Sequence, residues 1–350
     1  MSTHRRMKPL RIFAPSLAIS IVGLVGVALG MGVTAAAVAL VLIAVEIAFS
    51  FDNAVLNAKI LHKMSPLWQR LFLTVGAVIA IFGMRIVFPI VVVSITAHLG
   101  WHEVMRLALH EPDQYAAKLE SAHVAISSFG GAFLLVLALD FFVDSTQQVM
   151  WLTRIERSLQ KLARHWAPPL IAVAAVIATA LIPANHHKRE TLIAGILGIV
   201  VYSLLHGLTE ILGRVQRRAK MATYTGGVAL LSFLYLEILD ASFSFDGVLG
   251  AFAITNKVVL IAVGLGIGAF WVRSLTVFMV HRGTLANYRY IEHGAHYTIL
   301  VLAVLLLVSI FFDVPEVITG LAGLGIIISS IVASRQATAA DARKDAILSK

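Results

Sequence analysis

The sequence predicts an all-α, polytopic membrane protein of about ten transmembrane helices. Apolar residues make up 59% of the 350 residues and charged residues only 13%, whereas soluble domains carry about 25% charged residues. The mean hydropathy is +0.88, and several apolar runs reach the roughly 20 residues that span a hydrocarbon core as a helix. These observations together exclude a large soluble domain.

The apolar segments divide into two sets of five. The predicted spans are residues 11–30, 33–61, 67–98, 124–144, 168–184, 190–213, 222–254, 257–280, 294–312 and 316–334. The first set occupies residues 1–184, the second occupies 185–334, and a polar tail follows at 335–350. Because each set has an odd number of spans, the second set crosses the membrane in the opposite direction. The sequence therefore predicts two inverted five-helix repeats.

The basic residues fall in alternate loops, which is typical of membrane topology. With a cytoplasmic N-terminus, 21 of the 28 Lys and Arg residues lie on the cytoplasmic side and five on the outer side. The other two, Arg85 and Arg273, lie within spans. We expect both termini in the cytoplasm and a location in the inner (plasma) membrane, in contact with the lipid bilayer. The net charge of +9 follows from this topology and does not indicate a nucleic-acid partner.

The first predicted span has a second interpretation as a cleaved signal peptide, because Arg5, Arg6 and Lys8 precede it. Its apolar run, from Ile12 to Met31, is longer than the apolar part of a signal peptide, and no small-residue cleavage motif follows it. We therefore expect a retained helix.

A short acidic motif occurs once in each half of the chain, inside apolar sequence. Residues 46–53 read Glu-Ile-Ala-Phe-Ser-Phe-Asp-Asn, and residues 240–247 read Asp-Ala-Ser-Phe-Ser-Phe-Asp-Gly. Both copies contain Phe-Ser-Phe-Asp, with another carboxylate six residues before the Asp. Carboxylates are costly to keep in hydrocarbon, so their presence there indicates a functional site. Each copy lies in the second span of its half, so the two should meet near the middle of the membrane.

Helical spacing places most of the polar residues of each copy on one face. The first stripe is Glu46, Ser50, Asn53 and Asn57, and the second is Glu237, Asp240 and Ser244. The predicted metal ligands are Glu46, Asp52, Asn53, Glu237, Asp240 and Asp246, with Ser50, Ser244, Arg85 and Arg273 as supporting residues.

Two acids of the motifs lie off these stripes. Asp52 and Asp246 either face another neighbour, such as Arg85 or Arg273, or turn inward because the helix is interrupted at Phe-Ser-Phe-Asp. Gly247 favours an interruption in the second copy, and broken helices recur at the binding sites of transporters.

The two motifs would supply only oxygen ligands. Carboxylates, amides and hydroxyls suit Mg²⁺, Ca²⁺ or Mn²⁺, and the chain has no cysteine to supply a thiolate. Clustered acids take up protons when no metal is bound, which suggests metal/proton antiport. The alternative is that Arg85 and Arg273 neutralise the acids as buried ion pairs, but two arginines are too few for five acids.

Three weaker pairs of polar residues stand one helical turn apart: Asp140 and Asp144, His206 and Glu210, and Glu292 and His296. The first pair forms either a cytoplasmic vestibule or a helix end at the interface. Each of the others is either a proton relay or a structural hydrogen bond. No nucleotide-binding or hydrolase motif is present, so we expect no enzymatic activity and no cofactor.

The motif at 46–53 resembles the E-x-x-x-S-x-D-N motif of the TerC family of membrane proteins. Residues 240–246 resemble that family's second acidic motif. The amino-acid sequence at residues 236–247, 250–255 and 291–295 is similar to that of a related branch known only as a domain of unknown function. Gly247 stands where the TerC family usually has Ser, and Glu237 is an added acid.

This resemblance covers about residues 33–312 and implies a seven-helix-type core within the larger set. It implies export of Mn²⁺ or Ca²⁺, with a link to tellurite resistance. It also implies that Glu46, Asp52, Asn53, Asp240 and Asp246 form the ion site.

The sequence thus predicts a secondary transporter that exports a divalent metal cation, with Mn²⁺ the first candidate, in exchange for protons. The alternative is a membrane metallation or assembly factor, or a metal-stress scaffold, without net transport. An exporter of small organic cations is disfavoured, because an oxygen-only acidic site lacks the apolar sub-pocket that such substrates need.

Overall fold

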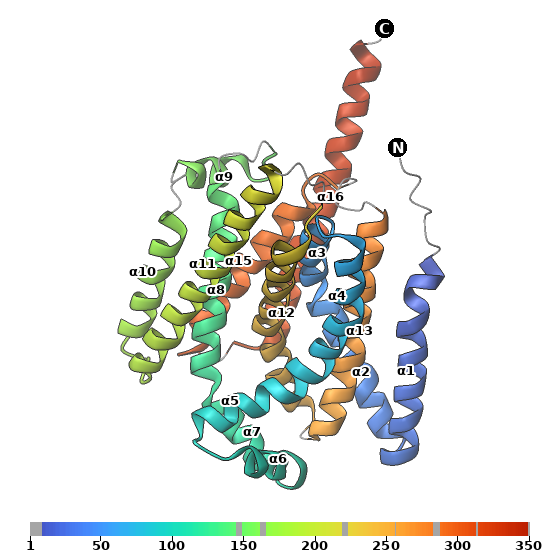
Figure 1. Cartoon of the computed structure of the whole chain (residues 1–350), viewed down its shortest axis with the longest axis vertical. Helices are drawn as coiled ribbons and strands as arrows, with labels where there is room; N and C mark the ends of the chain where they lie inside the picture. Colours follow the sequence, from blue (N-terminus) through green and yellow to red (C-terminus); the bar gives the residue numbers. More distant parts are fainter. Residues whose placement is uncertain are drawn as a thin grey trace.

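The computed structural model describes residues 9–144, 149–161, 166–218, 223–255, 257–282, 288–312 and 314–348. Within these ranges the chain is helical, without a β-strand (Figure 1). The side chains of Asp52, Ser244 and Asp246 lie outside the described part, although the backbone at all three positions is helical.

The first half contains five predicted spans and three short helices outside them. Its spans are α1 (Pro9–Met31), α2 (Val33–Phe49) with α3 (Phe51–Leu61), α4 (Pro66–Val78) with η1 (Ile79–Val87) and α5 (Phe88–Thr96), α8 (His123–Val143) and α10 (Ala167–Leu181). The short helices are α6 (Trp101–His110), α7 (Pro112–Ser121) and α9 (Thr153–Gln160). The second half contains α11 (Lys188–Arg218), α12 (Gly226–Ile254), α13 (Val258–Arg282), α15 (Ile291–Ser309) and α16 (Glu316–Leu348).

The described helices are those of a multi-pass membrane protein. Seven of them are long and apolar enough to cross a membrane: 12–31, 66–95, 123–143, 188–208, 258–280, 291–309 and 321–341. The remaining predicted spans fall on helices of a different kind. α10 and the apolar part of α2 are shorter. α12, which carries three acids and includes side chains outside the described part, is not among the seven. The tail is helical as far as it is described, because α16 continues to Leu348.

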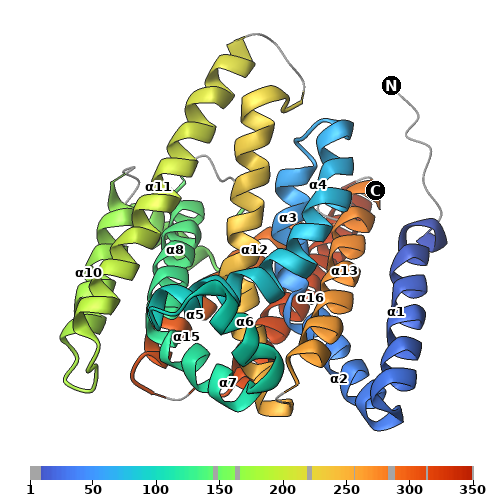
Figure 2. The same cartoon turned by 60° about the horizontal axis from the view of Figure 1, so that its bottom comes forward.

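The direction of the helices fits an even number of spans. α1 begins and α16 ends at the same end of the bundle (Figures 1 and 2). The chain reverses between α1 and α2 at Gly32, whose φ of +94° is a conformation that residues with a Cβ rarely adopt. Which membrane face this end occupies stays a prediction from the charge distribution.

Helices of one half pack against helices of the other half in a reciprocal pattern. α2 packs on α13 while α12 packs on η1, and α3 packs on α15 while α12 packs on α8. The second span of each half therefore contacts the third and fourth spans of the other half. α2 and α3 run upward in Figure 1, whereas α12 runs downward. These relations fit the predicted inverted repeats, which stay a prediction.

A short backbone link joins the two helices that carry the motifs. The N–H of Ser65 donates to the carbonyl of Tyr224 at 3.0 Å, and the N–H of Tyr224 donates to the carbonyl of Lys63 at 2.7 Å. Met64 and Tyr224 form an isolated parallel β-bridge. The end of α3 is thereby tied to the start of α12.

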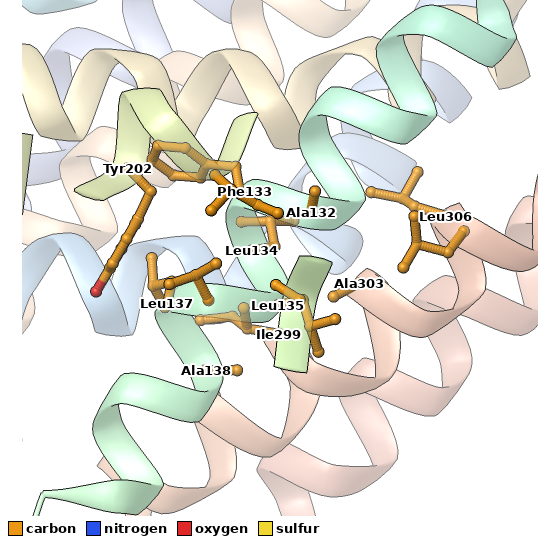
Figure 3. Packing of buried hydrophobic residues seen from close by; sticks show 14 of the residues in the cluster. Ala132, Phe133, Leu134, Leu135, Leu137, Ala138, Tyr202, Ile299, Ala303 and Leu306 are labelled. Carbon is orange, nitrogen blue, oxygen red and sulfur yellow. The ribbon is translucent and has the colours of Figure 1, made fainter. Parts of the chain in front are cut away.

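α8 is the centre of the largest buried apolar cluster. Phe133, Leu134 and Leu137 of α8 lie among side chains of α11 and α15, including Tyr202 and Ile299 (Figure 3). This packing holds the fourth spans of the two halves together and fixes one wall behind the motif helices.

The first motif helix is interrupted and the second is not. α2 ends and α3 begins at Ser50, whose φ of −99° and ψ of 18° depart from α-helical values. α12 runs unbroken through the second motif, from Gly226 to Ile254. The expectation that Gly247 favours an interruption is therefore wrong. Gly247 faces Glu46, since a Cβ there would lie at an ordinary contact distance, 3.4 Å, from Oε2 of Glu46.

Candidate functional site

The first motif places its leading acid against an arginine of the next span. Glu46 lies at the end of α2 and is 6% exposed. Its Oε1 accepts a hydrogen bond from Nη2 of Arg85 at 2.5 Å and another from the Ser50 hydroxyl at 3.1 Å. Arg85 also donates to the carbonyl of Ala80 at 2.6 Å. The Ser50 side chain, at the helix break, lies one turn after Glu46 and donates its hydroxyl hydrogen to the Glu46 carboxylate.

Glycines of the second half make room for Glu46. A Cβ at Gly268 of α13 would lie 2.5 Å from the Cβ of Glu46, closer than real Cβ contacts. Gly264, one turn earlier, packs in the same way against Leu42. The glycines at 264–268 thus allow close helix packing, and one of them, Gly268, packs on the site itself.

The second motif places two acids on one arginine. Nη2 of Arg273 donates to both carboxylate oxygens of Glu237 at 3.2 Å and to Oδ2 of Asp240 at 3.0 Å. Nη1 of Arg273 donates to the carbonyl of Phe72 at 2.9 Å, and the guanidinium carbon lies 4.2 Å from the centre of the Phe72 ring. Gly76 leaves the space, since a Cβ there would lie 2.5 Å from Nη1 of Arg273.

One hydrogen bond crosses directly between the two motif helices. Nδ2 of Asn57, on α3, donates to Oδ1 of Asp240, on α12, at 3.0 Å. Asn53 and Asn57 are both buried, and the Oδ1 atom of each has no hydrogen-bond partner within the described structure. A buried acceptor without a partner is rare in proteins because its desolvation is uncompensated.

These groups surround one small cavity. Its volume is about 20 Å³, which is room for one water molecule or one ion of similar size. Its walls combine the first polar stripe, the second motif and both arginines: Glu46, Ser50, Asn53, Asn57, Ala80, Arg85, Asp240, Ala269, Val272 and Arg273. Asp240 is the fifteenth of the 29 residues of α12, so the cavity lies midway along that helix.

The structure places the predicted site residues in three groups. Glu46, Ser50, Asn53, Asp240, Arg85 and Arg273 line the cavity. Glu237 is buried behind it and reaches it through Arg273. Asp52, Ser244 and Asp246 stand in α3 and α12, but their side chains lie outside the described part. Among the described side chains, no three acids or histidines are close enough to hold a metal ion.

The arginines pair with more of the acids than expected. Arg85 pairs with Glu46, and Arg273 pairs with Glu237 and Asp240. These three carboxylates and two guanidiniums carry a net charge of −1, so the described cluster still favours a cation. Asp52 and Asp246 are additional acids on the same two helices.

Sequence reasoning left three contributors to the site out of its candidate list. Asn57 belongs to the predicted stripe, and its position relative to Glu46 was the available signal. The carbonyls of Ala80 and Phe72, which accept from the two arginines, had no sequence signal, because backbone acceptors depend on how the helices pack.

The weaker polar pairs lie outside the cavity. His206 lies 3.3 Å from Asp140, and the carboxylate of Glu210 pairs with Arg214. Tyr202 also donates to Asp140, at 2.9 Å.

The pair of Glu292 and His296 also divides. Glu292 pairs with Lys59 at 3.0 Å. His296 contacts the backbone carbonyl of Glu292 and stacks on Phe141.

The fold and the buried polar cavity define a polytopic helical membrane protein with a site between its two halves. The chain matches the family described as "Protein of unknown function (DUF475)" over residues 51–340, and it belongs to this family. The matched range contains both arginines, the whole second motif and the first motif from Phe51 onward. Glu46 lies five residues before it. No curated protein and no solved structure matches the chain.

Proposed function

We propose that the protein is a secondary transporter that exports a divalent metal cation, with Mn²⁺ the first candidate, in exchange for protons. The observation that carries this proposal is the meeting of the two acidic motifs at one buried cavity midway along α12. Binding at the interface of two oppositely directed halves is the arrangement from which alternating access arises in secondary transporters.

The chemistry of the cavity favours a hard cation. Its walls offer carboxylate oxygens from Glu46 and Asp240, a hydroxyl from Ser50 and amide oxygens from Asn53 and Asn57. Within the described part of the chain, the two amide oxygens have no donor, and a bound cation would supply the missing partner. Mn²⁺, Ca²⁺ and Mg²⁺ prefer such ligands. The resemblance of both motifs to the TerC family supports the same choice.

A membrane metallation or assembly factor is the second candidate. Such a protein needs a site from which a partner can take the metal, and that site is best placed at the membrane surface. The buried position of Glu46 and Asn57, which are 6% and 1% exposed, favours transport through the protein over transfer at its surface.

Flux in sealed proteoliposomes tests the proposal. We expect Mn²⁺ to cross when the purified protein is reconstituted, faster under an opposing proton gradient and slowly after a protonophore is added. Glu190→Gln is the matched control, because Glu190 is an exposed acid outside the cavity and this variant should transport normally. Protein that binds metal without flux would support the metallation factor instead.

Coupling to protons has a separate test. Metal binding requires ionised carboxylates, so binding should release protons and weaken as the pH falls. Calorimetry in two buffers of different ionisation enthalpy would measure this release. Equal heats in both buffers, together with flux that ignores the pH gradient, would reject antiport and favour a uniporter.

A further inference from the structure

We propose that Arg85 is a tethered cation that occupies Glu46 while the site is empty and leaves it when the transported ion binds, whereas Arg273 stays in place. This inference rests on the proposed function, because it assigns a role within the same cation site.

The two arginines are held to very different degrees. Among the described side chains, Arg85 reaches one carboxylate oxygen, on Glu46, and one backbone carbonyl, on Ala80. Within the same described part, Arg273 reaches three carboxylate oxygens on two acids, one backbone carbonyl, and the face of an aromatic ring. Moving Arg273 would break its contacts with both Glu237 and Asp240, whereas moving Arg85 would break its contact with Glu46. Arg85 is therefore the guanidinium that a competing cation displaces at the lower cost.

The backbone that carries Arg85 also differs from the backbone that carries Arg273. Arg85 lies in η1, a π-helix from Ile79 to Val87 within the third span, whereas Arg273 lies in the continuous α-helix α13. π-helical segments are rare and occur mostly at functional sites. Because a π-helix is wound less tightly than an α-helix, conversion of η1 to α-helix would rotate Arg85 about the axis and withdraw its guanidinium from Glu46.

Arg85 and the ion compete for the same carboxylate. A guanidinium and a divalent cation on Glu46 would repel each other strongly in this buried place. Once Arg85 leaves, Glu46 can join the partnerless amide oxygens of Asn53 and Asn57 and Asp240 as ligands. Among the described side chains these two amide oxygens have no donor, which is a second observation in favour of a cation at this cavity.

A fixed ion pair is the competing explanation, in which Arg85 only holds Glu46 in position. The two explanations predict opposite changes in affinity. A tethered cation competes with the metal, so its removal tightens metal binding. A positioning partner helps the metal, so its removal weakens binding.

The test compares Arg85→Gln and Arg273→Gln with the wild-type protein, using Mn²⁺ alone as the probe. We expect Arg85→Gln to bind Mn²⁺ about tenfold or more tightly in calorimetry, because one competing unit charge has gone. We expect its flux in proteoliposomes to fall, because the tethered cation no longer expels the ion. Arg106→Gln, at an exposed arginine outside the cavity, should match the wild type. Wild-type or weaker affinity in Arg85→Gln overturns the proposal.

Folding of the variants gives a second readout. Arg85→Gln leaves Glu46 without its counter-ion, so Mn²⁺ should raise its melting temperature more than that of the wild type. Arg273→Gln should be destabilised whether or not Mn²⁺ is present. If Arg85→Gln unfolds equally with and without Mn²⁺, or if Mn²⁺ rescues both variants alike, the proposal is rejected. Wild-type protein that neither binds nor transports Mn²⁺, Ca²⁺ or Mg²⁺ would instead reject the proposed function.

Discussion

The two motif regions share the sequence Phe-Ser-Phe-Asp, yet their backbone geometry and their ion pairs differ. In the first half the helix breaks at Ser50, the following span contains a π-helix, and one acid pairs with one arginine. In the second half both helices are continuous, and Arg273 gathers two acids, a carbonyl and a ring. This difference supports the proposal that Arg85, in the first half, moves while Arg273, in the second half, stays in place.

The largest effect expected is the loss of transport when either motif loses its final acid. Asp52→Asn and Asp246→Asn should each abolish Mn²⁺ flux, since intramembrane carboxylates present in both halves point to one shared site. Flux in proteoliposomes measures this, with circular dichroism and gel filtration to show folded protein. Wild-type flux from one of the two folded variants would mean that the ion is served by one half only.

Substitution of the two arginines should lower the stability of the protein by different amounts. Arg273→Gln should lower the free energy of unfolding by about 3–5 kcal/mol, the usual cost of removing one partner from a buried ion pair. Arg85→Gln should cost less without metal, because only Glu46 loses its partner. Thermal unfolding in detergent compares them. Equal losses would contradict the distinction between a movable Arg85 and a fixed Arg273.

The close glycines give a smaller effect that should be similar in both halves. Gly268→Ala would push a methyl group against Glu46, and Gly76→Ala would push one against Arg273 and Glu237. Each should cost about 1–3 kcal/mol, as overpacking does, and should reduce flux.

Gly26→Ala is the control for these two variants. No atom lies within 4 Å of a Cβ at Gly26, so the melting temperature and the flux should stay at wild-type values. Tolerance of alanine at Gly268 would show that Glu46 can move away easily.

The smallest effect is expected at the helix break. Ser50→Ala removes the hydroxyl that donates to Glu46, which should cost about 1 kcal/mol and change Mn²⁺ affinity by less than about tenfold. Titration calorimetry measures the affinity. A complete loss of binding would assign Ser50 a direct place in the ion's coordination.

Helix positions and the first polar stripe could be predicted from the sequence because both depend on local periodicity. Glu46, Ser50, Asn53 and Asn57 share a face at helical spacing, and the structure brings all four to one cavity. An interruption at Phe-Ser-Phe-Asp was one of two alternatives offered by the sequence, and the first copy breaks there, at Ser50. The sequence could not show which copy breaks, because Gly247 favoured an interruption in the second copy and the helix continues through it.

Which acids pair with which arginine also could not be predicted from the sequence. Arg85 and Arg273 were visible as intramembrane charges, but their division among three acids depends on how α12, α13 and η1 pack. The same applies to His206, whose neighbour in space is Asp140, on a helix more than 60 residues earlier.

The size of the cavity has a consequence for the choice of ion. A volume of about 20 Å³ with Arg85 on Glu46 has room for about one water-sized particle. A divalent cation therefore cannot enter with its inner hydration shell while Arg85 is in place. Mg²⁺ releases water reluctantly and demands near-ideal octahedral geometry, whereas Ca²⁺ accepts irregular oxygen ligands. The small space around Glu46 and Asp240 would thus select cations by the cost of removing their water. This selection would disfavour Mg²⁺ before the ligands discriminate among the other cations.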